Sequence, residues 1–348
     1  MVLARALPVL AVTSLFACGG DAATLAPVVD APPAAPDAPV APARLSISGT
    51  QILDPSGNSI ILRGYNWGEW GTALAGDAAD NKAQGASSVR LPLRWWGDYK
   101  PGIDGRATDA PGHIDPAHLA ALDQTVEWAT SGGLWVVLFV DSNYGQGAHD
   151  QTDNFWTDAA MKQEFIEVWK FLVARYRSTP YIAAYEILPE PQVAVSDADV
   201  RAFYDSVIVE IRTVDPVTPL VVGPGNSYSL KRLDGAHTTA DPRIIYTGDY
   251  FIFADTLDRM PNITEFQATY HAPVWINQVG IPSGNADAQA KSRAVLGALN
   301  DAGVGWAWWT YRAPTMNPAL HGIFILDANG NWIEKPGDWL GLVGDFLR

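Results

Sequence analysis

One glutamate stands out because the backbone around it is stiff. Glu190 lies between Pro189 and Pro191, directly after the apolar run 185–188. That run is typical of a buried strand, and proline ends it because proline offers no N–H to a sheet ladder. A carboxylate held at a strand end is a candidate general acid/base. The same side chain could instead cap a helix or pair with a lysine or arginine, so the surrounding elements must decide.

Strands and helices alternate along most of the chain. Amphipathic, helix-length segments separate the apolar runs, and the clearest are 118–130, 159–176, 197–214 and 286–302. Near-continuous apolar strands alternating with helices predict a parallel sheet covered by helices. Eight such repeats predict a (β/α)8 barrel, an α/β fold. The eight predicted strands are 60–66, 88–93, 134–140, 182–188, 219–223, 243–247, 273–277 and 304–309.

The N-terminal part of the chain differs from the barrel in composition. Arg5 and an apolar run precede Cys18, and residues 1–18 resemble a bacterial lipoprotein signal whose cysteine is lipidated. An ordinary cleaved signal with a chance cysteine is the alternative. Residues 19–43, rich in alanine and proline, predict a disordered tether. The folded domain is expected over 44–348, opening with a short β-hairpin at 45–53 that closes the bottom of the barrel.

Composition narrows the possible partners. The chain has 348 residues, and 38 acidic against 23 basic side chains give a net charge of −15, which argues against nucleic acid and anionic membranes. Fourteen tryptophans and twelve tyrosines suit stacking on sugar rings. The six histidines lack the spacing of metal ligands, and no glycine-rich phosphate loop is present. We expect an exported monomer that binds carbohydrate, needs no cofactor or metal, and meets a membrane only through a lipid on Cys18.

The catalytic residues of a (β/α)8 barrel lie at the C-terminal ends of its strands. The side chains there are polar and aromatic, and no Ser-His-Asp order occurs among them. Glu186, inside the fourth strand, is expected to be buried and paired with an arginine. The candidate strand-end residues are Asn66, Trp67, Arg90, Arg94, Trp95, Trp96, Asp141, Glu190, Asn226, Asp249, Tyr250, Gln278, Trp309 and Arg312.

The order of several short motifs resembles glycoside hydrolase family 5, the cellulase-type barrel hydrolases. The resemblance covers roughly residues 45–348 and rests on 62–67 (LRGYNW), 89–92 (VRLP), 133–138 (GLWVVL), 185–191 (YEILPEP) and 306–309 (WAWW). It implies a retaining mechanism with two glutamates. Glu190 matches the acid/base, Arg90 the strand 2 arginine, Tyr250 the strand 6 tyrosine and Trp309 the sugar platform. Trp67 and Trp96 are further candidate sugar contacts.

The departures from the family pattern are equally informative. Pro189 stands where the family has asparagine, and Asp141 and Asp249 stand where it has histidines. Gln278 occupies the nucleophile position, and a neutral amide cannot form the usual glycosyl ester. It also lacks the negative charge that would raise the pKa of the acid/base.

Three functions stay open on the sequence. The first is a glycosidase for β-glucan or mannan in which Asp249 or Asp141 activates water across the sugar, giving inversion. The second is a lipid-anchored protein that binds carbohydrate without hydrolysis. The third is a barrel with an unrelated function.

Overall fold

Side-chain caps decide where the helices begin. The computed structural model describes residues 44–68, 72–96, 105–142, 155–191, 195–234, 239–251 and 257–348, so the predicted signal with Cys18 and the tether lie outside the described residues. Asp115 accepts hydrogen bonds from the first backbone N–H groups of one helix, and Asp158 does the same for the next. Ser196 caps the N-terminus of a third. These caps satisfy N–H groups that have no partner within the helix.

The predicted alternation of strand and helix is confirmed. Each predicted strand corresponds to an observed one, with ends that differ by a few residues, and 159–176 is helical over its whole predicted length. In chain order the elements are β1 (Ser46–Ser48), β2 (Gln51–Leu53), β3 (Arg63–Asn66), α1 (Asp77–Gln84), β4 (Ser88–Trp96), α2 (Pro116–Ser131), β5 (Trp135–Ser142), α3 (Ala159–Tyr176), β6 (Ile182–Glu186), α4 (Asp197–Arg212), β7 (Leu220–Val222), α5 (Gly225–Tyr228), β8 (Ile244–Tyr246), β9 (Asp249–Phe251), α6 (Met260–Tyr270), β10 (Trp275–Gly280), α7 (Ala288–Asp301), β11 (Gly305–Trp308), β12 (Phe324–Leu326), β13 (Trp332–Glu334) and α8 (Trp339–Gly344).

The large sheet closes through a strand that is split in two. Its order is β8-β7-β6-β5-β4-β3-β11-β10-β9, and every neighbouring pair is parallel. Thr247 and Gly248 separate β8 from β9, so the two end strands are consecutive in the chain. The Thr247 N–H donates to Val222 of β7, and its hydroxyl accepts from Asn277 of β10. Thr247 therefore joins the two edges of the sheet. Because β8 and β9 together form one interrupted strand, the nine strands make an eight-stranded barrel.

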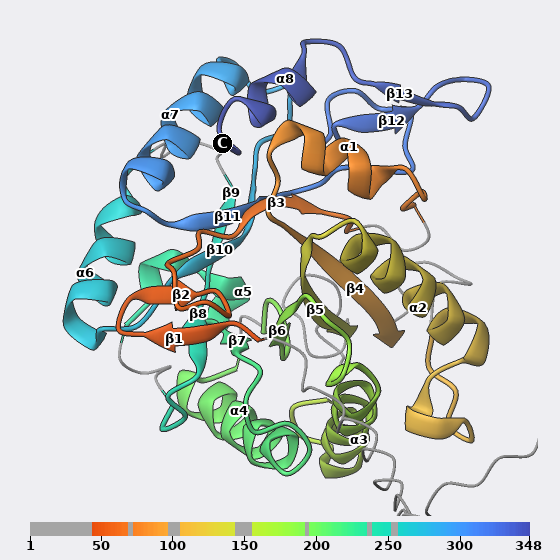
Figure 1. Ribbon diagram of the computed structural model, residues 1–348, viewed down its shortest axis with the longest axis vertical. Coiled ribbons are helices and arrows are strands. Elements are labelled where there is room, and N and C mark those ends of the chain that lie inside the picture. The colour runs from red at the N-terminus through yellow and green to blue at the C-terminus, as the bar shows by residue number, and fades with distance from the viewer. Residues whose placement is uncertain are drawn as a thin grey trace, which may run out of the picture. The chain divides into compact units, whose positions relative to one another are not determined.

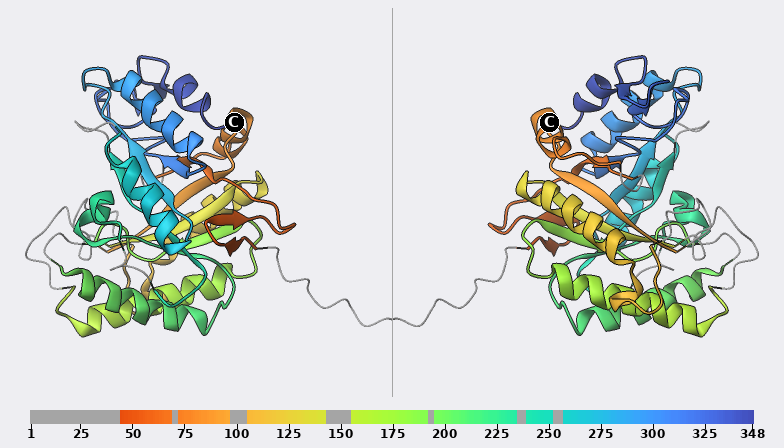
Figure 2. Two further views of the ribbon diagram at one scale, coloured as in Figure 1. Left: turned by 90° about the vertical axis from the view of Figure 1, so that its left-hand side faces the viewer. Right: turned by 90° about the vertical axis from the view of Figure 1, so that its right-hand side faces the viewer.

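The helices lie outside the strands, as Figure 1 shows for α2, α3, α4, α6 and α7 and the two side views of Figure 2 repeat. The apolar faces of these helices are buried against the sheet; α3, for example, buries Phe165, Trp169 and Leu172. Parallel sheets need this cover because both of their faces carry apolar side chains. Among the described residues, no helix is long and apolar enough to cross a membrane.

The N-terminal hairpin packs against the N-terminal end of the barrel, the bottom that it was predicted to close. Leu45 and Ile52 belong to one apolar cluster with Trp135, Ala183 and Trp275, which lie at the beginnings of barrel strands. Because those are the N-terminal strand ends, the hairpin closes the face of the barrel opposite to Glu190. The sequence patterns missed the short helices α1 and α8, the helix α6 and the hairpin β12–β13, whose apolar residues lack a long regular period.

The hairpin is expected to contribute to stability through Ile52, which is 7% exposed. Replacing it with alanine removes buried methylene groups and leaves a cavity, so Ile52→Ala should lower the free energy of unfolding by about 2–4 kcal/mol. Urea denaturation measures the change. Ile333→Ala, at an isoleucine of β13 that is 43% exposed, is the matched control and should lose less than about 1 kcal/mol. Equal losses would show that the hairpin does not seal the barrel.

Candidate active site

Glu190 follows β6 in a conformation that few side chains adopt. Ile187 still pairs with β7, its N–H donating to Val221 O at 3.1 Å, and the ladder then stops before the two prolines. At Glu190 the backbone has φ +50°, in the left-handed region. A residue other than glycine in this region costs on the order of 1 kcal/mol or more, so its surroundings must hold it there.

Three predicted site residues meet at the C-terminal strand ends. Gln278 of β10 donates its side-chain N–H to Glu190 Oε1 at 2.6 Å and contacts Asp249 Oδ1 of β9 at 3.3 Å. Asp249 is also hydrogen-bonded to Glu190 directly. Gln278 and Asp249 are register partners in adjacent parallel strands, so the sheet itself sets them side by side. The arrangement is a carboxyl pair with one amide attached to both members.

The carboxyl pair holds a proton that an exposed pair would have lost. Burial raises the pKa of Asp249 well above its usual range, and the neighbouring charge of Glu190 raises it further. The Arg90 guanidinium opposes both effects. Two carboxyl groups in contact cannot both ionise without strong repulsion. Asp249 is therefore the member of the pair that keeps its proton to higher pH, and Glu190 accepts hydrogen bonds from it and from Gln278.

Arg90 lies beneath this pair, inside the barrel. Its guanidinium donates to both oxygens of Glu186, at 2.5 and 2.9 Å, and to Asn66 Oδ1 at 2.9 Å. It stacks on the Phe139 ring at 3.6 Å and is 1% exposed. The expected pairing of Glu186 with an arginine is confirmed. Burial and these bonds favour a supporting role for Arg90, whose charge acts on Asp249.

The amide groups around Arg90 complete the buried network. Asn277 Nδ2 donates to Glu186 Oε1 at 2.8 Å, and Asn66 Nδ2 donates to the Asn277 carbonyl at 2.8 Å. The network therefore spans β3, β4, β6 and β10. Breaking one half of a buried ion pair is strongly destabilising because it strands a charge, so Glu186 cannot serve as an extra catalytic carboxylate without loss of the fold.

The aromatic candidates separate into buried and partly exposed groups. Trp67 is 3% exposed and donates its indole N–H to Asn81 Oδ1, so it lies in the core rather than on a sugar-binding surface. Tyr250, on β9, is also fully buried. Trp309, directly after β11, is partly exposed. Its ring lies so close to Gly68 that a Cβ there would come within 2.3 Å of it, so only glycine allows this placement.

Two further candidates are described only in their backbone. Trp96 ends β4 and pairs with Ser142 of β5, while Asp141 pairs with Arg94. Both thus lie at the correct end of the barrel, and their predicted contacts with sugar stay predictions. Among the described residues, no group of three or more His, Cys, Asp or Glu side chains could hold a metal ion.

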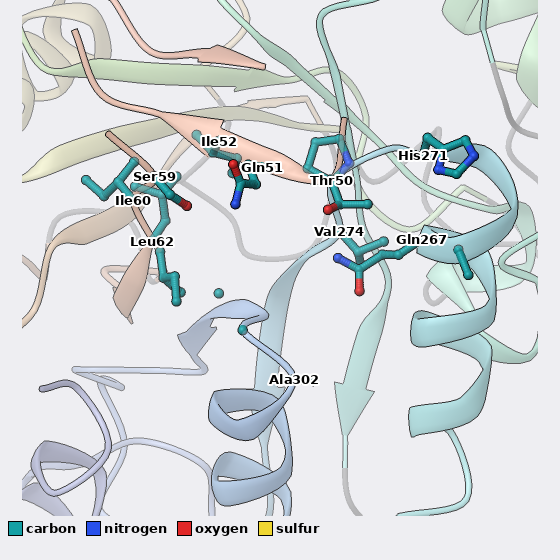
Figure 3. Close-up of a pocket in the computed structure, with 15 residues that line it drawn as sticks. Thr50, Gln51, Ile52, Ser59, Ile60, Leu62, Gln267, His271, Val274 and Ala302 are labelled. Atoms are coloured by element: carbon teal, nitrogen blue, oxygen red, sulfur yellow. The ribbon is translucent and has the colours of Figure 1, made fainter. Parts of the chain in front are cut away.

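One cavity of about 440 Å³ lies at the other end of the barrel (Figure 3). Thr50 and Gln51 from the hairpin and Gln267 from α6 surround it, together with Leu62 and Val274 near the N-terminal strand ends. No carboxylate lines it. Chemistry in this fold needs the strand ends that carry Glu190, so this cavity is not the candidate active site.

Comparison with known proteins agrees with the fold. A model of the cellulase family (glycosyl hydrolase family 5) matches residues 53–314. This chain belongs to that family. Endoglucanase E-5 from Thermobifida fusca is 25% identical over 317 residues, covering 85% of this chain and 62% of the relative. Mannan endo-1,4-beta-mannosidase 3 from Oryza sativa is 26% identical over 245 residues, covering 60% of this chain and 50% of the relative.

A solved structure of an endoglucanase from Thermotoga maritima has a TM-score of 0.63, with 17% identity over 82% of this chain and 96% of that one. This likeness supports the barrel. Alignments with three further curated relatives cover 47%, 17% and 38% of those proteins, so the chain spans less than half of their length. The family is one of glycosidases, and its members named here are an endoglucanase and a mannosidase.

The sequence patterns did not single out Tyr204, Tyr228 or Trp169, whose side chains bond the backbone before Glu190. Trp169 and Tyr204 look like ordinary core positions of amphipathic helices. Tyr228 had one visible signal, its place in the glycine-rich stretch that follows the fifth strand. Their role depends on where their polar atoms point, which spacing alone does not reveal.

The raised pKa of Asp249 predicts a distinctive pH dependence of stability. The unfolded chain releases the Asp249 proton near pH ~3.9, whereas the folded protein keeps it to a higher pH. The stability that this proton confers is therefore fully present below pH ~3.9 and is lost as pH rises through the folded pKa. Asp249→Asn cannot ionise. Its free energy of unfolding relative to wild type should therefore increase from pH ~4 upward, as urea denaturation across pH would measure.

Asp241→Asn is the matched control with the opposite sign. Burial of Asp241 raises its pKa, but hydrogen bonds from Arg212 and from the Arg243 backbone outweigh that and lower it. Its stabilisation is present above the unfolded pKa and lost as pH falls through the folded one. The control should thus be less stable than wild type at pH ~7 and approach it in acid. Parallel pH trends in the two variants would contradict the assignment of the proton to Asp249.

Proposed function

We propose that this protein is a retaining glycoside hydrolase for β-linked glucan or mannan, in which Glu190 and Asp249 are the two working carboxyl groups. Glu190 is the general acid/base, and Asp249 takes over the nucleophile's role from Gln278. The observation that carries the proposal is the single amide nitrogen of Gln278, which lies 2.6 Å from Glu190 and 3.3 Å from Asp249.

The spacing of the two carboxyl groups favours retention over inversion. Both reach the same nitrogen atom, so their oxygens cannot be as far apart as the roughly 6.5–9.5 Å that inverting enzymes need to admit water. Retaining enzymes hold the pair about 5–5.5 Å apart, and substrate binding would open the hydrogen-bonded pair toward that distance. The inverting role that the sequence suggested for Asp249 does not fit this contact.

The pair contains one proton, which is the number a retaining mechanism needs. In the resting state that proton is on Asp249, and transfer across the direct hydrogen bond places it on Glu190. The Arg90 charge favours this transfer because it stabilises the Asp249 carboxylate. Each member of the pair then has the charge that its step requires.

Two displacements follow from this ionisation state. In the first, the Asp249 carboxylate attacks the anomeric carbon, the glycosidic C–O bond breaks, and the Glu190 proton passes to the leaving oxygen. In the second, the Glu190 carboxylate removes a proton from water while the water oxygen attacks the anomeric carbon. The glycosyl–Asp249 bond breaks, and the carboxylate is released.

The substrate class rests on the relatives and on Trp309. An endoglucanase and a mannan endo-mannosidase are among the similar proteins. Trp309 offers a partly exposed aromatic face at the strand ends, and such faces bind the apolar faces of pyranose rings. The acidic chain suits neutral polysaccharide rather than phosphorylated ligands.

A second function, carbohydrate binding without hydrolysis, is favoured by one observation. The Glu190 carboxylate is already occupied by Gln278 and Asp249, and Asp249 is only 7% exposed. If substrate does not open the pair, the site binds sugar and leaves the bond intact. Turnover of oligosaccharides separates the two functions.

Export and anchoring are part of the proposal. The signal-like residues 1–18 would direct the chain out of the cytoplasm, and a lipid on Cys18 would tether the barrel to the cell envelope through residues 19–43. Mass spectrometry of the membrane fraction tests this, because Cys18→Ser should abolish the lipid adduct and release soluble protein. An adduct that persists in this variant would contradict it.

Each carboxyl group is expected to be essential for turnover. Glu190→Gln and Asp249→Asn should each lower kcat on cello- or manno-oligosaccharides by roughly 10³-fold or more, because a group of the catalytic pair is lost. Calorimetry should show oligosaccharide binding within about tenfold of wild type. Asp123→Asn, at a surface carboxylate paired with Arg175 on α3, is the control and should keep wild-type kcat. Full activity in Asp249→Asn would exclude its role as the nucleophile.

The stereochemical outcome gives an independent prediction. Proton NMR of the first products should show net retention of the β-anomer, since two displacements restore the configuration. An activated 2-fluoro glycoside should accumulate a covalent adduct, and mass spectrometry should locate it on the peptide that contains Asp249. Inversion would instead assign the reaction to a single displacement and return Asp141 as the candidate base.

A further inference from the structure

Three non-glycine residues with left-handed backbone conformations lie on the two segments next to the carboxyl pair. Glu190 has φ +50°, and after β7 both Asn226 (φ +56°) and Tyr228 (φ +54°) are left-handed as well. Tyr228 packs on the stretch that leads to Glu190. Strained residues persist only where the surrounding structure holds them, and they cluster at functional sites.

Three buried side chains hold the backbone just before Glu190. Trp169 donates its indole N–H to Ile187 O at 2.9 Å. Tyr228 and Tyr204 both direct their hydroxyl groups to Leu188 O, at 2.7 and 3.0 Å. These carbonyls lie beyond the last residue of β6, so side chains replace the sheet in satisfying them.

Tyr228 fits this place only because of Gly223. A Cβ at Gly223 would come within 2.7 Å of the Tyr228 ring. Tyr204 accepts a hydrogen bond from the Gly223 backbone and is hydrogen-bonded to Tyr228. The two phenols thus join the end of β6 to the end of β7. Burial raises the pKa of both, so they stay protonated donors across the assay range.

We propose that Tyr228 and Tyr204 are positioning residues that hold the backbone before Glu190 so that its carboxylate stays in contact with Gln278 and Asp249. This inference rests on the proposed function and names residues outside the reacting groups. Without the two hydroxyls, the strained backbone at Glu190 can relax toward a commoner conformation. Such a relaxation turns the carboxylate away from its partners, because φ at Glu190 sets the direction of its Cα–Cβ bond.

The test uses Tyr228→Phe, Tyr204→Phe and the double variant of the full chain. Each single change keeps the ring and removes one donor, so kcat should fall roughly 10–100-fold with KM within about twofold. The double variant should fall further than either single one. Tyr176→Phe is the matched control because it removes a phenol that bonds Asp123 at 2.8 Å on the outer helices, and its kcat should stay unchanged.

A second readout does not depend on activity. Carbon-13 NMR of labelled carboxyl groups, assigned with Glu190→Gln and Asp249→Asn, should show Glu190 and Asp249 titrating as a coupled pair in wild type. In Tyr228→Phe the pKa of Asp249 should move toward its usual value, because contact with Glu190 is reduced. Coupled titration that is unchanged in the double variant, or kcat that falls no more than in the Tyr176→Phe control, would overturn the proposal.

The two readouts keep this proposal separate from the function it rests on. If wild type hydrolyses no β-glucan or mannan oligosaccharide, the proposed function fails, and the titration still decides whether the tyrosines hold Glu190 in place. If wild type is active and the titration does not respond, the function stands and the positioning role is rejected.

Discussion

The site is organised by one buried guanidinium, which pairs with Glu186 and whose charge also acts on Asp249. Arg90 is fully engaged with Glu186, so those two charges balance each other inside the barrel. Glu190 and Asp249 lie above them as a second, hydrogen-bonded carboxyl pair. Desolvation then forces the pair to keep a proton, and the Arg90 charge limits how tightly Asp249 holds it. The ionisation of the site thus follows from the placement of one buried arginine.

Gln278 gives this site a different chemistry from a pair of glutamates. A second glutamate there would repel Glu190, whereas the amide donates to it and brings Asp249 into the same contact. The neutral side chain cannot attack an anomeric carbon, but it can hold two carboxyl groups together. In the proposed mechanism, the attacking carboxylate therefore belongs to the adjacent strand β9, where Asp249 is the register partner of Gln278.

Backbone geometry positions the reacting groups of the site as much as side-chain contacts do. The prolines around Glu190 remove N–H donors from the sheet ladder. The carbonyls of Ile187 and Leu188 accept hydrogen bonds from an indole and two phenols instead. These donors come from α3, α4 and the end of α5, which are distant in sequence but packed against β6. Helices that form the outer layer of the barrel thereby help to orient a residue at its catalytic end.

The sequence alone determined the eight barrel strands, the longest helices and which residues end each strand, because hydrophobic period, caps and prolines are local signals. It therefore identified Glu190, Asp249 and Gln278 as neighbours of one barrel face and Glu186 as buried. Only the tertiary structure decided that Arg90 and Trp67 are enclosed and that Asp249 touches Glu190. Those outcomes depend on closure of the barrel at Thr247, which joins β7 to β10. No local pattern encodes the distance between side chains as far apart in the chain as Glu190 and Asp249, since packing and register set that distance.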